Sequence, residues 1–524
     1  MTPSTVAAAL DPVAALLLDA VGYGGTPVAL GDGQQEPGLR LRRQVTVAGA
    51  GFVVQHCVGA RVVAEEPLPV SALPIDPTAL RPRPRRHPAA QAPLTVAATP
   101  AGDGRSGGRG GGADVLDAAD AGDAVVCGTG GAGDAHRVVV PATGPSLPCI
   151  DAIRAAAVRH RLVRLDPGPT GVPLTGDPLL WGGLVLRLVA SGTVCLLPGT
   201  ALDAVAGLSQ RVRATLPADG SGSIDADVVA AVEHDDLALA RVAAEQRRAA
   251  LADHDLALTW QPGTGDGPWA PALRPRPVPT VSVLLTTRRP GLVPTALSMV
   301  AGQRGIALEV IIALHGSHDP GPAEAALRAA DLPGQVLVVP GEVPFGAALN
   351  AAVERTSGDL VLKWDDDDLY GPHVVEDLVL AQRASGAALT GKAAEFVHLG
   401  SQDRTVWRTP ARAEGPSMTL AGGTFLTPRS VLIEVGGYPP ITRAVDHHLK
   451  ARVAAVGGEV YRTHGFGFVL RRHGQGHTWT ADDQRFLAQA VAVFDGVPAI
   501  VGVADAARFA NVPVPPAPDA GGPR

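Results

Sequence analysis

The sequence predicts an α/β fold with a largely parallel sheet in the C-terminal half of its 524 residues. From Thr280 onward, short apolar runs typical of strands alternate with amphipathic runs typical of helices, which favours parallel strands joined by right-handed crossovers. One apolar run ends in four consecutive aspartates, Asp365 to Asp368. Because ligands bind at the carboxyl ends of strands in open α/β sheets, this run also predicts where a site lies.

The elements of this half follow one another in a regular order. The apolar runs predict strands at Val281–Leu285, Leu308–Leu314, Gln335–Val339 and Leu360–Trp364. The helical period predicts the helices between them at Leu292–Ala301, Pro322–Ala330 and Gly346–Arg355. We expect one domain over 280–500 and a disordered tail over 501–524, where large apolar residues are too few to fold.

The N-terminal half is predicted to hold two further parts. Residues 1–100 form a small β-rich unit, with two or three strands within Leu39–Pro67, and residues 115–270 form a mixed α/β region. A Gly-rich linker over 101–114 joins them, and an Arg/Pro linker over 271–279 leads to the C-terminal half.

Two segments of this half have an alternative interpretation. Arg81–Arg86 alternates arginine with proline and is expected to be a solvated linker, with contact to anionic lipid headgroups as the alternative. Gly128–Gly133 matches G-x-G-x-x-G, but the residues after it predict a strand and not a helix. We therefore favour a glycine-rich hairpin over a dinucleotide-binding loop.

Composition excludes several classes of protein. The chain is 46% hydrophobic and 18% charged, which is typical of a globular protein, and its net charge of −7 without a basic excess argues against nucleic-acid binding. Its four cysteines show no Cys-x-x-Cys spacing, so we expect reduced thiols in a cytoplasmic protein. The N-terminal apolar stretch contains Asp11 and Asp19 and no basic region, which excludes a signal peptide, and we expect no transmembrane segment.

The acidic run is the most informative feature of the chain. Four adjacent carboxylates cannot all stay ionised cheaply without a counter-charge, so they indicate a cation site or a titrating site. Their hard oxygens suit Mg²⁺ or Mn²⁺, which would in turn hold the phosphates of a nucleotide. The alternative is a solvated acidic turn, which the apolar strand directly before the run disfavours.

Several motifs share an order and spacing along about 280 to 480. They are Val281–Pro290, Gln303, Leu308–Ile312, Phe345–Ala352, Ser357–Asp359, Asp365–Pro372, Gly422–Thr424, Val435–Tyr438 and Ala444–His447. Together they resemble the family 2 glycosyltransferases of GT-A fold. The resemblance implies a metal-dependent enzyme that moves a sugar, with inversion, from a nucleotide-sugar donor to a glycan or lipid-linked acceptor of the cell envelope.

The resemblance also implies the roles of two groups of acidic residues. Asp365 and Asp367 match the D-x-D positions that bind the divalent cation and the donor diphosphate, with Asp366 and Asp368 as substitutes. Asp446 stands at the second position of the family's Glu-Asp motif, whose carboxylate acts as base on the acceptor hydroxyl.

Other residues are assigned to the metal and to the donor. His473 lies in a segment that resembles the family's C-terminal segment and is preferred over His477 as the third metal ligand. The residues expected to bind the donor are Thr286, Thr287, Arg288, His315, Asn350, Asp366, Gly422 and Gly423.

The chain departs from the family pattern at two points. Val445 replaces the first acidic residue of the Glu-Asp motif, and Leu314-His315 stands where the family has two aspartates that include a ligand of the base or ribose. His315 could donate to the base, or Thr286 and Thr287 could read the nucleoside instead. These departures keep open a catalytically silent GT-A-like scaffold or binding module.

A phosphatase of the haloacid-dehalogenase type is a second alternative, since it also places D-x-D after a strand. Leu369 and the absence of a part for Asp446 disfavour it. For location we expect the cytoplasm, with peripheral contact at the inner face of the membrane as a hypothesis.

Overall fold

A computed structural model describes the backbone of seven strands before residue 167 and, after them, residues 178–190, 192–197, 202, 205–216, 235–254, 278–316, 319–408, 414–473, 483–503 and 514. The Gly-rich linker over 101–114, Arg81–Arg86, Gly128–Gly133 and His477 lie outside these residues, as does most of the segments over 271–279 and 501–524. The chain divides into two compact units, and 277–524 belongs to the second.

The first unit contains a five-stranded sheet in the order β5-β6-β4-β7-β8. Its strands are β4 (Leu94–Ala98), β5 (Val125–Cys127), β6 (Arg137–Val140), β7 (Leu162–Asp166) and β8 (Val194–Leu196). Neighbours are parallel except for β5, which pairs antiparallel with β6 as the expected hairpin requires. Because β4 is central to this sheet, the α/β region begins before residue 100.

Three helices of this unit are described: α3 (Pro178–Ala190), α5 (Gln210–Thr215) and α7 (Asp236–Asp253). Helix α7 begins after Asp235, whose carboxylate caps it by accepting hydrogen bonds from the backbone N–H groups of Leu237 and Ala238. From α7, the Gln246 amide accepts from the N–H of Cys195 at 2.9 Å and donates to its carbonyl at 2.8 Å. A helix side chain therefore pairs with β8 as a neighbouring strand would.

A separate sheet of three strands lies near the N-terminus. Its strands, β1 (Leu41–Ala48), β2 (Gly51–Val58) and β3 (Arg61–Leu68), pair in sequence order. This confirms the strands predicted within Leu39–Pro67.

The main sheet of the second unit is built on four parallel strands in the order β11-β10-β9-β12. They are β9 (Val281–Thr287), β10 (Leu308–His315), β11 (Gly334–Val339) and β12 (Leu360–Trp364), each within two residues of its predicted bounds. Beyond β12 the sheet continues through four short strands, β18 (Leu426–Pro428), β14 (Leu389–Lys392), β19 (Val460–Thr463) and β17 (Gly415–Pro416). Since β18 runs antiparallel to β12, the sheet is mixed on this side.

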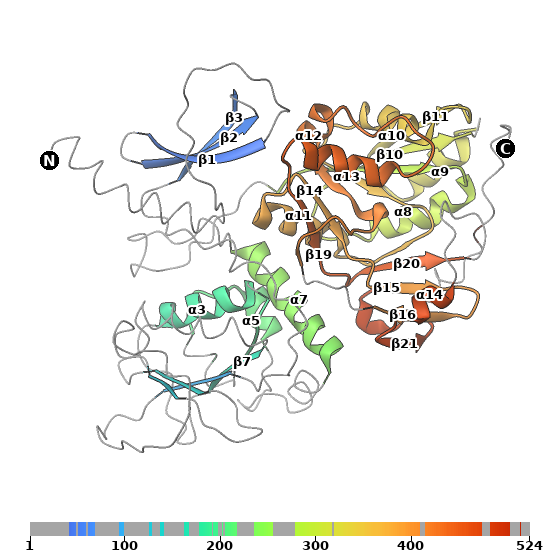
Figure 1. The fold of residues 1–524 in the computed structure, drawn as a ribbon. Coiled ribbons are helices and arrows are strands. Elements are labelled where there is room, and N and C mark those ends of the chain that lie inside the picture. The colour runs from blue at the N-terminus through green and yellow to red at the C-terminus, as the bar shows by residue number, and fades with distance from the viewer. Residues whose placement is uncertain are drawn as a thin grey trace, which may run out of the picture. The chain divides into compact units, whose positions relative to one another are not determined.

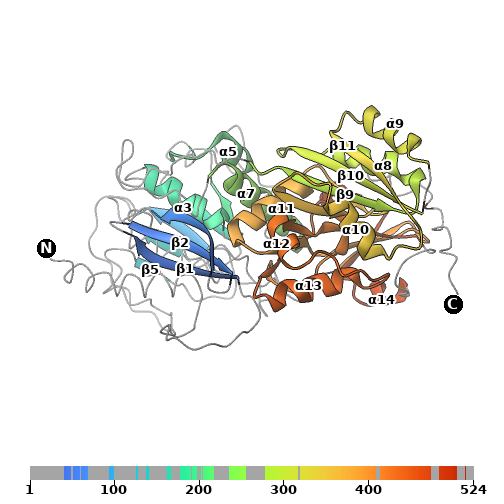
Figure 2. The same cartoon turned by 90° about the horizontal axis from the view of Figure 1, so that it is seen from above.

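Helices cover both faces of this sheet, so it forms the middle of three layers (Figures 1 and 2). On one face Val283 and Leu285 pack with α8 (Val293–Ala301), α9 (Gly321–Ala329) and α11 (Val374–Ser385). On the other, Leu284 packs with α10 (Phe345–Val353), α12 (Arg429–Glu434) and α13 (Val445–Ala455). Both faces of β9 are buried, which explains its unbroken apolar run.

A smaller sheet in the order β13-β20-β15-β16-β21 completes the unit. Its strands are β13 (Leu369–Tyr370), β15 (Phe396–Leu399), β16 (Arg404–Trp407), β20 (Phe468–Arg472) and β21 (Ala492–Asp495), and Phe486 of α14 (Asp483–Leu487) packs on it. Single 3₁₀ turns occur at Pro290–Leu292, Gly422–Thr424 and Ala499–Val501. In the described part of the chain, no helix combines the length and apolar character needed to cross a bilayer.

The strand order reverses between β9 and β12. Strand β10 and then β11 extend the sheet on one side of β9, whereas β12 pairs on its other side with Leu285 opposite Trp364. The loops that follow β9 and β12 therefore leave the sheet side by side, and such a switch point is where open α/β sheets bind ligands.

Candidate functional site

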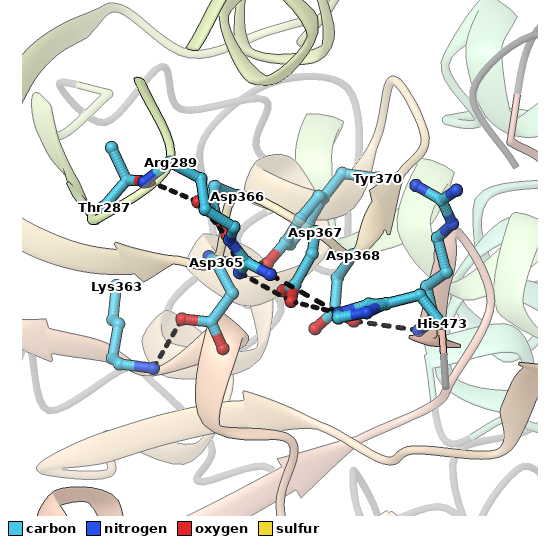
Figure 3. A network of polar contacts seen from close by, with 10 residues as sticks. Thr287, Arg289, Lys363, Asp365, Asp366, Asp367, Asp368, Tyr370 and His473 are labelled. Carbon is cyan, nitrogen blue, oxygen red and sulfur yellow. Dashed lines mark hydrogen bonds and ion pairs between the residues drawn. The ribbon is translucent and has the colours of Figure 1, made fainter. Parts of the chain in front are cut away.

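The acidic run leaves the end of β12 at this switch point, and Figure 3 shows its carboxylates between Lys363 and His473. Arg289, from the loop after β9, forms ion pairs with Asp366 and with Asp367, the latter at 2.7 Å. His473 Nε2 lies 3.0 Å from the same Asp367 oxygen. The loop after β9 and the residue that follows β20 thus converge on Asp367.

The other two carboxylates have partners of their own. Lys363 Nζ lies 2.6 Å from Asp365 Oδ1, and Asp368 accepts a hydrogen bond from the backbone N–H of Arg471 at 2.9 Å. Tyr370, stacked on Trp364 with ring centroids 3.7 Å apart, accepts from the Asp365 N–H and donates to the Gly423 carbonyl. The turn of the run is therefore fixed at both ends.

Burial separates the pKa values of these four groups. Loss of hydration raises the pKa of Asp365 and of Asp368, and burial beside the charge of Asp367 raises the pKa of Asp366 to about 6. Burial also disfavours ionised Asp367, but the hydrogen bond from His473 and the charge of Arg289 outweigh it and hold its pKa below the ordinary value. Asp367 is thus the carboxylate of the run most firmly kept as an anion.

Asp446, in the first turn of α13, lies beside this run. Its Oδ2 is 3.5 Å from Lys363 Nζ, and its Oδ1 is buried without a hydrogen-bond partner. Burial alone would lower the pKa of Lys363, but the charges of Asp365 and Asp446 raise it above its ordinary value. One buried ammonium group therefore serves both carboxylates.

The two glycines at 422 and 423 allow this close approach. A Cβ at Gly422 would lie 2.1 Å from Asp446 Oδ2, and a Cβ at Gly423 would lie 2.6 Å from the Tyr370 hydroxyl and 2.9 Å from Asp365 Oδ2. Any side chain here would displace one of the two carboxylates. The glycines therefore let the backbone approach these carboxylates closely, while contact with the donor stays a prediction.

His315 lies at the end of β10 with both ring nitrogens in hydrogen bonds, and its contact with the base stays a prediction. It is 1% exposed, its Nε2 donates to the Val343 carbonyl at 2.7 Å, and its Nδ1 accepts from Arg288 Nε at 3.2 Å. Burial lowers its pKa, which agrees with a neutral ring. Both ring nitrogens are engaged, so His315 holds Arg288 in place. Arg288 also donates to the Gly341 carbonyl. It follows the end of β9 and is more exposed than His315.

Asn350 and the two threonines are also resolved. Both ends of the Asn350 amide bond the backbone of Tyr438, each at 2.8 Å, so this side chain fixes the turn at Gly437. Thr287 donates to Asp366 and accepts from the Arg289 N–H, whereas Thr286 Oγ1 is buried without a partner. Thr287 therefore supports the acidic run.

Sequence reasoning placed Arg288 in the site but gave no role to Lys363. Lys363 is the only charged residue within an otherwise apolar strand and precedes Asp365 by two positions, which puts both side chains on one face of the strand. That spacing was the available signal. Nothing local marked Arg289 as the partner of Asp366, because the two are 77 residues apart.

The residues present fit a divalent cation in part. In the described part of the chain, no group of three or more His, Cys, Asp or Glu side chains is arranged as a metal site. Asp367 and His473 nevertheless offer an oxygen and a nitrogen 3.0 Å apart, at a carboxylate that stays ionised. Asp365, the other predicted ligand, faces Lys363.

Acidic and basic side chains thus gather at the switch point of this α/β sheet, where sheets of this kind bind ligands. Residues 283–449 match the model of glycosyl transferase family 2. The match spans β9 to β12, the acidic run and Asp446. These residues are therefore similar to glycosyl transferase family 2, the family that the sequence motifs resemble, and they have the α/β fold expected for it.

Two of the solved structures that are similar to this chain contain a nucleotide-sugar. One is mannosyltransferase PcManGT from Pyrobaculum calidifontis in complex with GDP-Man and Mn²⁺, with 18% identity, a TM-score of 0.30, and coverage of 37% of this chain and 60% of that chain. Another is S. aureus TarS 1-349 in complex with UDP-GlcNAc, with 13% identity, a TM-score of 0.33, and coverage of 39% and 61%. The chain thus spans less than two thirds of either structure. No curated protein matches the sequence.

Proposed function

We propose that this protein is a nucleotide-sugar-dependent glycosyltransferase that uses Mg²⁺ or Mn²⁺ and inverts the anomeric centre in one displacement. The observation that carries the proposal is the convergence of Asp365 and Asp446 on Lys363 beside Gly422 and Gly423. This puts the carboxylates predicted to face the donor next to the carboxylate predicted to act on the acceptor.

In the proposed reaction, Asp446 accepts the proton of an acceptor hydroxyl as its oxygen bonds to the anomeric carbon. The sugar C–O bond breaks on the opposite side, and the nucleoside diphosphate leaves with the electron pair. The buried Asp446 oxygen without a partner supports a role as base, because such an atom is costly unless a ligand engages it. A positioned base is worth about 10²–10⁴-fold in rate.

Asp367 and His473 would hold the cation, with Asp365 as the third predicted ligand. When bound, a divalent cation supplies charge neutralisation for the departing diphosphate. Arg288 would add positive charge on the donor side of the site, since it follows the end of β9.

Calorimetric titration of UDP-, GDP- and TDP-sugars, with and without Mn²⁺, tests the donor site. We expect one nucleotide class to bind in a metal-dependent manner and Asp367→Ala to abolish that binding. The exposed Asp319, which only bonds the Gly321 N–H, provides the control variant Asp319→Ala, which should bind as the wild type does. No binding of any donor by the wild type would favour a silent scaffold.

The stereochemistry has a separate test. NMR compares the anomeric configuration of the released or transferred sugar with that of the donor. A β-product from an α-linked donor would report inversion. Retention of the configuration would contradict the single displacement.

The acceptor side of the proposal is a glycan or lipid-linked acceptor used at the cytoplasmic face of the membrane. It is motivated by the basic segment Arg81–Arg86. Co-sedimentation with anionic vesicles at low and high salt tests it, and binding that does not depend on salt would count against an electrostatic contact.

A further inference from the structure

We propose that Lys363 is a positioning residue for the base Asp446 and that it fixes the base relative to the donor side of the site. This inference rests on the proposed function, since it assigns Asp446 the role of base. Lys363 itself need not touch donor or acceptor.

Lys363 Nζ lies between two carboxylates. It lies 2.6 Å from Asp365 Oδ1 and 3.5 Å from Asp446 Oδ2, and its side chain is 4% exposed. A charged group this well shielded from water is costly unless it is paired, so the two carboxylates are the physical reason for a lysine in this strand. The same ammonium group holds both of them.

Few side chains of the described residues could hold the Asp446 carboxylate in place. Gly422 lies against its Oδ2 and offers no side chain, and its Oδ1 has no hydrogen-bond partner. Lys450, one turn along α13, directs its Nζ to the Met418 carbonyl instead. Lys363 is thus the only cation within 4 Å of the Asp446 carboxylate among the described residues.

Lys363 and Asp446 belong to different layers of the fold. Its backbone belongs to β12, which pairs with β9 in the centre of the sheet, whereas Asp446 belongs to α13 on one face of that sheet. A contact from the rigid sheet to the helix therefore sets the distance between Asp446 and the acidic run. Misplacement of a base by about 1 Å can cost about 10²-fold in rate.

A double-mutant cycle tests this arrangement. The readout is release of nucleoside diphosphate from the donor that binds, with water in place of the acceptor, so that no acceptor has to be known. We expect Lys363→Met to lower kcat by about 10- to 100-fold in the wild-type background but by less than about 2-fold in Asp446→Asn, because residues that act as a unit are not additive.

Lys392→Met is the matched control. Lys392 is also fully buried and also paired with an aspartate, Asp377 at 2.9 Å, and its ammonium group donates to the carbonyls of His464 and Phe466. Its effect on kcat, whatever its size, should be the same in both backgrounds. Donor affinity and melting temperature are recorded for each variant to show that it is folded.

The remaining outcomes distinguish a failure of this inference from a failure of the proposed function. An equal loss on Lys363→Met in both backgrounds would overturn the inference while the proposed function stands. If Lys363→Met does not fold, Lys363→Arg replaces it in the cycle, with the same non-additivity expected and additivity overturning the inference. A wild type that neither binds nor hydrolyses any donor would instead show that the proposed function itself has failed.

Discussion

Three carboxylates of the acidic run form ion pairs with basic side chains. Asp365 pairs with Lys363, whereas Asp366 and Asp367 pair with Arg289. This divides the run into two sides with separate compensating charges. Because Arg289 alone faces two carboxylates, it offers no excess positive charge to an anionic ligand.

The substitution Gly422→Ala, which adds a single methyl group, gives a prediction. The Cβ of Gly422→Ala would meet the flexible end of Asp446 and not the backbone, so the carboxylate should move while the fold persists. We expect donor hydrolysis to fall about 10²-fold, with the melting temperature nearly unchanged. Gly291→Ala is the control, because a Cβ there meets nothing within 4 Å. A large loss of stability in Gly422→Ala would contradict this reading.

His315 gives a prediction about pH. Burial lowers its pKa from the ordinary value of 6.5, so below pH 6.5 the unfolded chain takes up a proton that the folded chain refuses. The stability that the neutral ring contributes is therefore complete above pH 6.5 and is lost as the pH falls toward the folded pKa. The loss is at most about 1.4 kcal/mol per pH unit.

Urea denaturation of the wild type and of His315→Asn between pH 5 and pH 8 measures this effect. Asparagine keeps one donor and one acceptor for Val343 and Arg288 but does not titrate. We expect the wild type to lose stability relative to the variant as the pH falls. A difference that stays constant with pH would show that folding does not shift the pKa of this ring.

At the level of elements, the parallel strands were predictable because each is a continuous apolar run. β12 matches its predicted bounds, and β9 and β10 extend only by one or two residues at their carboxyl ends. The short strands β18 and β14 were not predicted, since three or four residues carry too little periodicity. They are defined by pairing across the sheet, which no local pattern encodes.

The residues of the site also divide into those that the sequence could predict and those that it could not. The D-x-D aspartates, Asp446 and His473 could be placed from motif order, and the structure brings Asp367 and His473 together. The partners could not be found this way, because the Lys363–Asp446 pair and the Asn350–Tyr438 pair join segments more than 80 residues apart. His315 was placed at the right strand end, but its burial depends on Val343 and Arg288, which come from other loops.

Gln246 gives a prediction about the pairing of α7 with β8. Gln246→Ala would leave the N–H and the carbonyl of Cys195 buried without partners, which costs about 1–3 kcal/mol each for a neutral group. For the two groups together, we expect denaturant unfolding to report a loss of about 2–6 kcal/mol. The neighbouring Glu245→Ala removes only a half-exposed i,i+4 ion pair with Arg241 and should change stability by less than about 0.5 kcal/mol. Equal effects would show that the amide pairing is not what stabilises this edge.

At the scale of the whole molecule, the two units have separate cores. Leu162, Val194 and Leu239 belong to the first, whereas the clusters on the two faces of the main sheet belong to the second. The linker over 271–279 was predicted close to the division of the chain at residues 276 and 277. The sheet of the first unit was harder to delimit, because β4 and β7 are far apart in sequence.

These separate cores predict how the protein responds to its ligand. A donor that binds the second unit with metal should raise the unfolding temperature of that unit by mass action and leave the first unchanged. Differential scanning calorimetry with nucleotide and Mn²⁺ measures this, and chelation of the metal with EDTA should reverse the shift. A shift that survives EDTA would contradict metal-dependent binding.

The pairing of Gln246 with Cys195 has a consequence for how copies of this protein meet one another. β8 is the last strand of its sheet, and an open strand edge is a template to which another chain can add. The Gln246 amide already occupies the backbone groups of Cys195 at the middle of this three-residue strand. A helix side chain thereby closes this edge to strand addition, which protects the unit from edge-to-edge aggregation.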